Sequence, residues 1–244
     1  MAQMNQRGEK KFMSPQSGPM RISIIIPVFN EERSIAATLA GLQPLVPDEL
    51  MVVDGGSTDR TREICESLGI TLISSKRGRA LQMNEGARTA TGDILLFLHA
   101  DTLLPDSALN DIRAVMANSE CVGGRFDVEL DGDHWMLWVI GAMISLRSRL
   151  TKVATGDQAI FVRREIFEKI GGYPDIPLME DIAFSRALKG MGKVACLRSR
   201  VITSARRWKM EGVWRTIWKM WTLKFLYLLG IPPARLKRYY SDAR

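Results

Sequence analysis

The chain has few of the residues that build metal centres and disulfide frameworks. It contains two histidines, His99 and His134, among 244 residues, so a histidine-rich metal site is excluded. Its three cysteines, Cys65, Cys121 and Cys196, are far apart and include no Cys-x-x-Cys pair. This spacing argues against structural zinc and against a disulfide framework, and it fits a reducing, cytoplasmic location.

The sequence also lacks an even distribution of charge. The formal net charge is +7, but residues 189–244 hold 14 Lys and Arg against 2 Asp and Glu, a local excess of +12 that leaves the remainder at −5. A basic tail on an acidic body predicts an anionic partner such as phosphate, nucleic acid or a membrane surface. Residues 1–20 are polar, without the apolar run of a signal peptide, and we expect them to form a flexible tail.

Three short apolar runs, at 22–26, 50–53 and 94–98, each lead into polar and acidic residues. Such β-branched runs are typical of buried parallel strands. The carboxylates that follow them are Glu31, Asp54 and Asp101. Because open α/β sheets bind ligands at the carboxyl ends of their strands, this pattern predicts an enzyme that handles a nucleotide.

Helical patterns alternate with these runs and predict a doubly wound α/β sheet. We expect helices at 31–41, capped by Asn30, at 58–68, capped by Ser57 or Thr58, and at 79–90. A further strand is expected at 70–73 and a helix from Asp106. In the second half, the expected strands are 121–130, 158–162 and 193–202, and the expected helices are 135–150, 164–170, 179–191 and 213–229.

Each candidate site has a functional and a structural interpretation. Asp54-Gly55-Gly56 places a carboxylate where backbone can approach a ligand, or it is an ordinary turn between strand and helix. Asp101 can hold Mg²⁺ or Mn²⁺, or it caps the next helix. Glu180 and Asp181, in a first helical turn, offer a general base, or they complement the helix dipole.

Four motifs occur in order along the chain: Ile-Pro-Val-Phe-Asn-Glu-Glu at 26–32, Val-Asp-Gly-Gly-Ser-Thr-Asp at 53–59, Leu-His-Ala-Asp at 98–101 and Glu-Asp at 180–181. In order and spacing, these motifs together resemble those of family 2 glycosyltransferases. The resemblance implies the GT-A fold, a Rossmann-like, mostly parallel central sheet with helices on both faces, over residues 21–208. Residues 209–244 then form a basic amphipathic helical appendage. The stretch 155–164 is similar, more narrowly, to a bacterial subgroup often labelled for arsenosugar biosynthesis.

The resemblance implies roles for matching positions. Pro27, Glu31 and Asp54 match positions that hold the uracil and ribose of a UDP-sugar. Asp101 matches the Asp that binds a divalent metal, Mn²⁺ or Mg²⁺, bridging the diphosphate. Asp181, with Glu180 beside it, matches the catalytic base. His99 stands where many members have Asp, which removes one negative charge near the metal while leaving a group that can hydrogen-bond ribose.

Further contacts are implied around these positions. Arg77 and Arg79 lie where the family has a basic loop beside the nucleotide, and a solvated loop is the alternative. The resemblance implies donor or acceptor contacts by Gly156, Asp157, Arg207 and Trp208. Ser204 replaces the Gln of the Gln-x-x-Arg-Trp motif of polymerising relatives, so the motif is not evidence of polymer synthesis.

Trp214, Trp218 and Trp221 recur at i, i+4 and i+7, on one face of the helix expected at 213–229. Core packing or a dimer seam explains this pattern, and so does a helix lying in the headgroup layer of a membrane. The segment argues against a membrane span, because it carries three cations, each costing roughly 2.5–3.5 kcal/mol at a bilayer centre.

The predicted function is an inverting, hexosyltransferase-type glycosyltransferase with a nucleotide-sugar donor and a small-molecule or lipid-linked acceptor. The expected partners include no nucleic acid but do include a peripheral membrane contact through the C-terminal helix, or a second copy in a homodimer. A sugar-phosphate nucleotidyltransferase is the enzymatic alternative, although its Gly-rich first loop is replaced here by residues 27–30. The non-enzymatic alternative is a basic module that binds nucleic acid or membrane. This alternative leaves the carboxylates unexplained.

Overall fold

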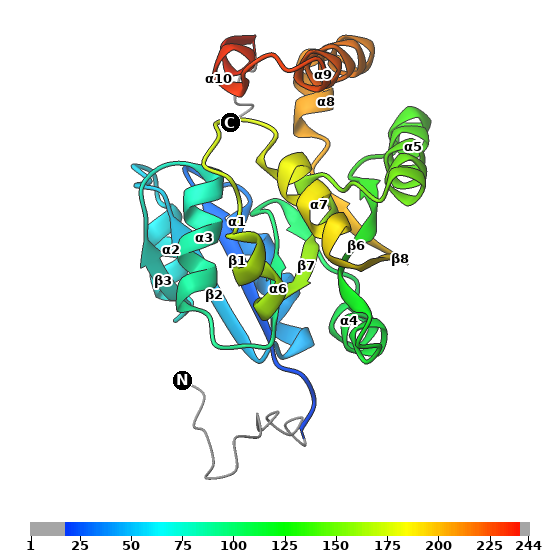
Figure 1. The fold of residues 1–244 in the computed structure, drawn as a ribbon. Helices are drawn as coiled ribbons and strands as arrows, with labels where there is room; N and C mark the ends of the chain where they lie inside the picture. Colours follow the sequence, from blue (N-terminus) through cyan, green and yellow to red (C-terminus); the bar gives the residue numbers. More distant parts are fainter. Residues whose placement is uncertain (1–17, 240–244) are drawn as a thin grey trace.

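The computed structural model describes residues 18–239, apart from the side chain of Arg207, and centres on one eight-stranded sheet (Figure 1). The strand order is β3-β2-β1-β4-β7-β6-β8-β5. The strands are β1 (Ile22–Val28), β2 (Glu49–Asp54), β3 (Thr71–Ser74), β4 (Ile94–Phe97), β5 (Thr102–Leu103), β6 (Cys121–Leu130), β7 (Ile160–Arg163) and β8 (Lys193–Thr203). The expected flexible tail lies largely outside the described residues.

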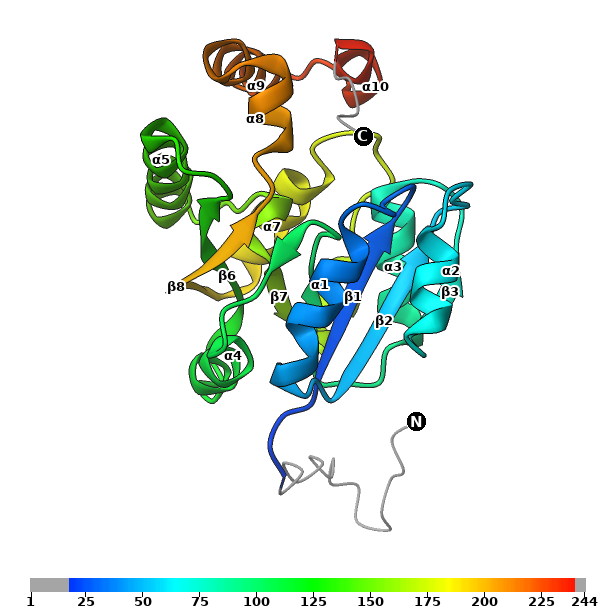
Figure 2. The same ribbon diagram turned by 180° about the vertical axis from the view of Figure 1, so that it is seen from behind.

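Helices cover both faces of this sheet (Figures 1 and 2). They are α1 (Ile35–Leu42), α2 (Thr61–Ser67), α3 (Arg79–Thr89), α4 (Ala108–Met116), α5 (Trp135–Thr151), α6 (Arg164–Ile170), α7 (Glu180–Met191), α8 (Arg206–Glu211), α9 (Val213–Leu228) and α10 (Pro233–Leu236). Short 3₁₀ turns occupy Gln43–Leu45, Gly156–Gln158 and Lys237–Tyr239.

The alternation of side chains along β1 divides the core into two layers. Ile24 faces the layer formed with α1, α2 and α4, whereas Ile25 faces the layer formed with α3, α6 and α7. Gly86 allows α3 to lie close to the sheet, because a Cβ at this position would come within 2.4 Å of Ile25 Cγ2. The apolar runs therefore read as strands buried on both faces, as predicted.

The predicted α/β sheet is confirmed, and its pairing is mixed. The first four strands of the order pair in parallel, whereas β7 is antiparallel to both β4 and β6. The two-residue strand β5, antiparallel to β8, was not predicted, because a strand this short has no periodicity of its own.

Two predicted helix starts are wrong by several residues. The first helix begins at Ile35 rather than at residue 31, and Asn30 has a left-handed backbone with φ of 54°. Its Oδ1 instead accepts a hydrogen bond from the Thr58 N–H at 2.9 Å. The second helix begins at Thr61, whose N–H donates to Asp59 Oδ1 at 3.0 Å. The residues just before α1 and α2 belong to the loops after β1 and β2, and these loops bond to each other. Capping rules for a single helix do not describe such contacts between loops.

Candidate active site

The loop after β2 is organised by Asp54, whose side chain is fully buried at the end of the strand. Its carboxylate accepts hydrogen bonds from the backbone N–H groups of Gly56 and Ser57, at 3.2 and 3.0 Å. Arg62 donates to the same carboxylate at 2.9 Å. Asp54 therefore shapes the loop predicted to meet the nucleotide, and all of these contacts are internal to the protein.

Gln82, which sequence reasoning did not single out, ties the ends of β1 and β2 together from α3. Its buried Nε2 donates to the carbonyl oxygens of Val28 at 2.6 Å and Val53 at 2.9 Å. A Cβ on Gly55 would meet the Gln82 amide at about 3.0 Å, so the glycine leaves room for this bridge. In the sequence, only the position of Gln82 on an otherwise apolar helix face could have indicated this role.

The basic loop before α3 reaches two parts of the predicted site. The guanidinium of Arg77 lies 4.1 Å from the centre of the Phe29 ring, two residues beyond Pro27 at the end of β1. Arg79 Nη1 lies 3.3 Å from Glu180 Oε1, at the start of α7. Two arginines predicted to contact the nucleotide are thus held between the loop after β1 and the carboxylates of α7.

Glu31 and Asp101 come together around Arg206. Arg206 Nη2 lies 3.4 Å from Glu31 Oε2 and 4.0 Å from Asp101 Oδ2. The Ser204 N–H donates to the Asp101 carbonyl at 3.1 Å, which brings the start of α8 to the end of β4. Burial raises the pKa of Asp101, and the charge of Glu31 raises it further, while Arg206 opposes both.

The arginine that reaches this pair was not among the predicted contacts of the segment. Arg206 does so, whereas the side chain of the predicted Arg207 lies outside the described residues. The predicted Trp208 packs against an apolar cluster that includes Leu130, Leu137 and Ile140. Its contacts therefore anchor α8 against β6 and α5.

His99, Gly156 and Asp181 meet in a small pocket that Arg79 and Tyr173 also line. The Gly156 N–H donates to Asp181 Oδ2 at 2.7 Å, and the Ile182 N–H lies 2.7 Å from Oδ1. A Cβ on Gly156 would lie 2.6 Å from His99 Nε2, so only glycine permits this approach. Burial, and secondarily Arg79, lowers the pKa of His99 to about 3, so the imidazole is neutral at neutral pH.

The two neighbouring carboxylates of α7 have different environments. Glu180 is buried, and its pKa is raised by burial and by Asp181 but lowered by Arg79. Asp181 lines the pocket and has two backbone N–H groups on its carboxylate. Asp181 is therefore the carboxylate that faces the pocket, while Glu180 pairs with Arg79.

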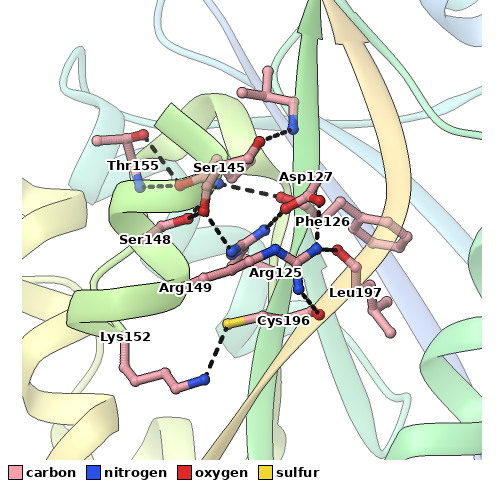
Figure 3. A network of polar contacts seen from close by, with 12 residues as sticks. Arg125, Phe126, Asp127, Ser145, Ser148, Arg149, Lys152, Thr155, Cys196 and Leu197 are labelled. Carbon is pink, nitrogen blue, oxygen red and sulfur yellow. Dashed lines mark hydrogen bonds and ion pairs between the residues drawn. The ribbon is translucent and has the colours of Figure 1, made fainter. Parts of the chain in front are cut away.

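The turn that carries Gly156 is fixed by a buried polar network (Figure 3). Asp127 on β6 pairs with both Arg125 and Arg149. Arg125 Nη2 donates to the Ser145 carbonyl at 3.1 Å, and Ser148 Oγ donates to the same oxygen at 3.0 Å.

The network reaches the turn through Gln158. Its Nε2 donates to Ser148 Oγ at 2.9 Å, and its Oε1 accepts from the Thr155 N–H at 3.2 Å. Contacts between α5 and β6 thereby set the position of the Gly156 amide. The predicted contact residue Asp157 lies in the same turn, and burial raises its pKa.

Solved structures share this arrangement of sheet and helices. A mannosyltransferase from Pyrobaculum calidifontis, determined with GDP-Man and Mn²⁺, superposes with a TM-score of 0.65 at 19% identity, covering 86% of this chain and 63% of that one. Glucosyl-3-phosphoglycerate synthase from Mycobacterium tuberculosis, determined with Mg²⁺ and UDP, has a TM-score of 0.59 at 20% identity, covering 87% and 80%. The chain thus has the GT-A fold, with carboxylates gathered at the carboxyl ends of its strands.

Sequence comparison assigns the family. The profile of glycosyl transferase family 2 matches residues 23–171, and the chain belongs to this family. A PGL/p-HBAD biosynthesis glycosyltransferase of Mycobacterium bovis is 35% identical over an alignment of 170 residues, with a coverage of 64% of this chain and 64% of the relative. The probable glycosyltransferase YdaM of Bacillus subtilis is 26% identical over 233 residues, covering 82% of this chain and 52% of the relative. The match thus spans about two thirds or less of the length of these relatives.

Proposed function

We propose that the chain transfers a sugar from a nucleotide-diphosphate donor, a UDP-sugar, to an acceptor hydroxyl with inversion at the anomeric carbon. The observation that carries this proposal is the pocket-facing carboxylate of Asp181, whose oxygens are held by the N–H groups of Gly156 and Ile182. A carboxylate fixed in this way is suited to take the proton of a hydroxyl as that hydroxyl attacks the sugar. Membership of the family supports the same reaction.

In this proposal the donor lies along the loops after β1, β2 and β4. Arg77, beside Phe29, is available to the base or phosphates, and Asp54 holds the loop that meets the nucleoside. His99, being neutral, offers a hydrogen bond without adding charge beside the base. Arg206 and Arg79 place positive charge near the diphosphate that leaves. Residues 21–208 would thus form the catalytic domain, with 209–244 as an appendage.

Asp101 is the residue proposed to hold a divalent metal. The described residues contain no group of three or more His, Cys, Asp and Glu side chains that could hold a metal ion alone. A single partly exposed carboxylate beside Glu31 nevertheless fits Mg²⁺ or Mn²⁺, which keep waters and take other oxygens from substrate phosphates. When bound, the ion would supply charge neutralisation for the leaving diphosphate.

The donor and metal are tested together by thermal unfolding. UDP at about 100 times its Kd should stabilise the protein by roughly 2.7 kcal/mol. For a chain of this size we expect a rise in Tm on the order of 5–10 °C with UDP and Mn²⁺. Asp101→Ala should abolish the Mn²⁺-dependent part of this rise.

Asp106→Ala is the matched control, since Asp106 is an exposed carboxylate shortly after Asp101, and it should keep the full rise. A Mn²⁺-dependent rise that survives in Asp101→Ala would remove Asp101 as the metal residue. No rise with any of a panel of nucleotides, in protein that unfolds cooperatively, would overturn the proposed donor.

We also propose that α9 docks on an anionic membrane surface. Trp214, Trp218 and Trp221 are 75%, 77% and 65% exposed, so they do not form a core within the described chain. The stripe continues through Phe225, and Trp138 on neighbouring α5 is 61% exposed. These helices lie at the end of the molecule where the strands of the site end (Figures 1 and 2). The described part of the chain contains no helix long and apolar enough to cross a bilayer.

Charge favours a membrane over a second copy as the occupant of this face. Residues 212–239 include no Asp or Glu but do include exposed Arg215, Arg235 and Arg238. A symmetric pair of copies would bring these like charges together, whereas anionic headgroups complement them. Apolar and aromatic side chains on one stripe with cations beside it are typical of interfacial helices.

Vesicle flotation tests this docking. The full chain should float with vesicles containing phosphatidylglycerol and much less with phosphatidylcholine alone. A Trp side chain that buries about 150 Å² gains about 3–4 kcal/mol, so Trp218→Ser should weaken vesicle binding by more than about tenfold. Val46→Ser, at an exposed apolar residue before β2, is the control and should float like the wild type. A chain that ignores both vesicles but sediments as a dimer dissociated by Trp218→Ser would assign the face to a second copy.

A further inference from the structure

Helix α9 has a second face, which packs against the element that carries the proposed base. Leu223 is buried in a cluster with Leu178, Met179 and Ile182, around the first turn of α7. Asp181 lies between two of these cluster residues in the sequence. The helix whose outer stripe carries the tryptophans thus lies over the start of α7, next to the pocket.

This packing carries the side chain of Lys224, the residue after Leu223, into the charged surroundings of the pocket. Lys224 is partly buried and experiences the charges of Arg147 on α5, Asp157 in the 3₁₀ turn, and Asp181 and Arg186 on α7. Burial, followed by Arg147, lowers its pKa to about 8. Its ammonium makes no hydrogen bond, and no ion pair within 4.0 Å, with the described residues.

Arg147 is similarly short of partners. Its Nε is buried and has no hydrogen-bond partner among the described residues, and its Nη2 is 3.4 Å from Thr155 Oγ1. Burial lowers its pKa despite the attraction of Asp157 and Asp181. A partly buried cation with an unpartnered, buried N–H group is costly, and an anionic ligand that accepts its hydrogen bonds would offset that cost.

We propose that Lys224 and Arg147 form a subsite for an anionic group, a phosphate or carboxylate, carried by the acceptor beside the hydroxyl that Asp181 deprotonates. This inference rests on the proposed function and specifies its acceptor. The donor diphosphate is assigned to the side of Asp101 and Arg206, whereas Lys224 and Arg147 surround Asp157 and Asp181. The proposal therefore assigns α5, α9 and the 155–158 turn to the acceptor.

The anionic group has two chemical sources, a water-soluble phosphorylated or carboxylated acceptor and a lipid headgroup. The outer stripe of α9 is the proposed membrane contact, and Lys224 lies on the flank of the helix between that stripe and the face that packs on α7. A lipid-linked acceptor would therefore present its phosphate close to the subsite from the membrane side. The experiment below separates the two sources.

Calorimetric titration of the full chain, saturated with UDP and Mn²⁺, tests the subsite with glycerol 3-phosphate as the probe and glycerol as its uncharged counterpart. We expect glycerol 3-phosphate to bind at least about tenfold more tightly than glycerol. Lys224→Met should weaken phosphate binding at least about tenfold, and Arg147→Met should do the same. Lys169→Met, at an exposed lysine on α6, is the matched control and should bind like the wild type.

The pH dependence provides a readout that a purely structural lysine would not affect. A phosphate monoester is a dianion well above its second pKa of about 6. Wild-type affinity for the probe should therefore fall as the pH rises through about 8, where Lys224 loses its charge, and Lys224→Met should lack this fall. Lys224→Arg keeps the charge and should retain binding at high pH.

Phosphatidylglycerol vesicles provide the second arm. If Lys224→Met weakens vesicle binding, and if glycerol 3-phosphate displaces the wild-type protein from the vesicles, the anionic group belongs to a lipid. If only the soluble probe depends on Lys224, it belongs to a soluble acceptor. Wild-type binding of glycerol 3-phosphate no tighter than that of glycerol, or equal binding by wild type and Lys224→Met, would overturn the subsite. A UDP-dependent rise in Tm without phosphate binding would reject the subsite alone. No rise in Tm with any nucleotide of the panel would overturn the proposed donor, and with it the function on which the subsite rests.

Discussion

Replacing Asp181 with asparagine is expected to lower turnover by about 10²–10⁴-fold, the usual contribution of a general base. Asparagine has the same shape but does not accept the proton of the attacking hydroxyl. It also replaces one of the two oxygens that accept the N–H groups of Gly156 and Ile182. The measurement is the release of UDP from the donor identified by thermal shift, at saturating donor concentration.

Donor binding distinguishes a catalytic effect from a folding effect. The UDP-dependent rise in Tm should remain in Asp181→Asn, because the nucleotide is assigned to the loops after β1, β2 and β4. Asp133→Asn removes an exposed carboxylate outside the pocket and should turn over like the wild type. If Glu180→Gln lowers turnover more than Asp181→Asn does, the roles of the two α7 carboxylates are reversed.

The largest loss of stability is expected from Asp127→Ala. Asp127 is the shared partner of Arg125, which is 1% exposed, and of Arg149. Removing one partner of a buried ion pair typically costs about 3–5 kcal/mol, because the remaining charge stays desolvated. In this chain Arg125 Nε already has no hydrogen-bond partner among the described residues, which leaves little room for compensation. We expect Tm to fall on the order of 10 °C.

Glu129→Ala is a control from the same strand. Glu129 pairs with Arg200 at 3.4 Å in an exposed position, and such pairs contribute about 0–1 kcal/mol. Denaturant unfolding should therefore separate the two variants by at least about 2 kcal/mol in the free energy of unfolding. Equal losses would mean that the network of Figure 3 adds nothing beyond a surface ion pair.

Much of the first half of the fold was predictable, because its signals are local. Ile22–Val28, Glu49–Asp54 and Ile94–Phe97 are apolar runs that the structure buries as neighbouring strands. Their register at the same edge of the sheet brings Glu31 and Asp101 to a common arginine. Helix starts were less predictable. Asn30, the expected cap of the first helix, instead accepts a hydrogen bond from Thr58 in the loop after β2, and the second helix begins at Thr61 rather than at residue 58.

The predicted helix at 213–229 illustrates a pattern that is ambiguous by itself. The i, i+4, i+7 spacing of Trp214, Trp218 and Trp221 is the same whether the stripe faces a core, a partner or a lipid surface. Only the packing of Leu223 on the opposite face shows that the tryptophans point away from the chain's own core. Exposure is a property of the assembled fold, not of the helix.

The sequence by itself determined the class of fold and the family, and it supplied most of the carboxylates proposed for the site, because strand burial and loop chemistry depend on contiguous residues. Tertiary structure alone decided which other side chains lie around those carboxylates. Gln82, Arg147, Arg206 and Lys224 come from helices remote in sequence, and no local periodicity distinguishes them from other polar residues on a helix. Their surroundings arise from contacts between distant segments, and these contacts exist only once the helices pack on the sheet.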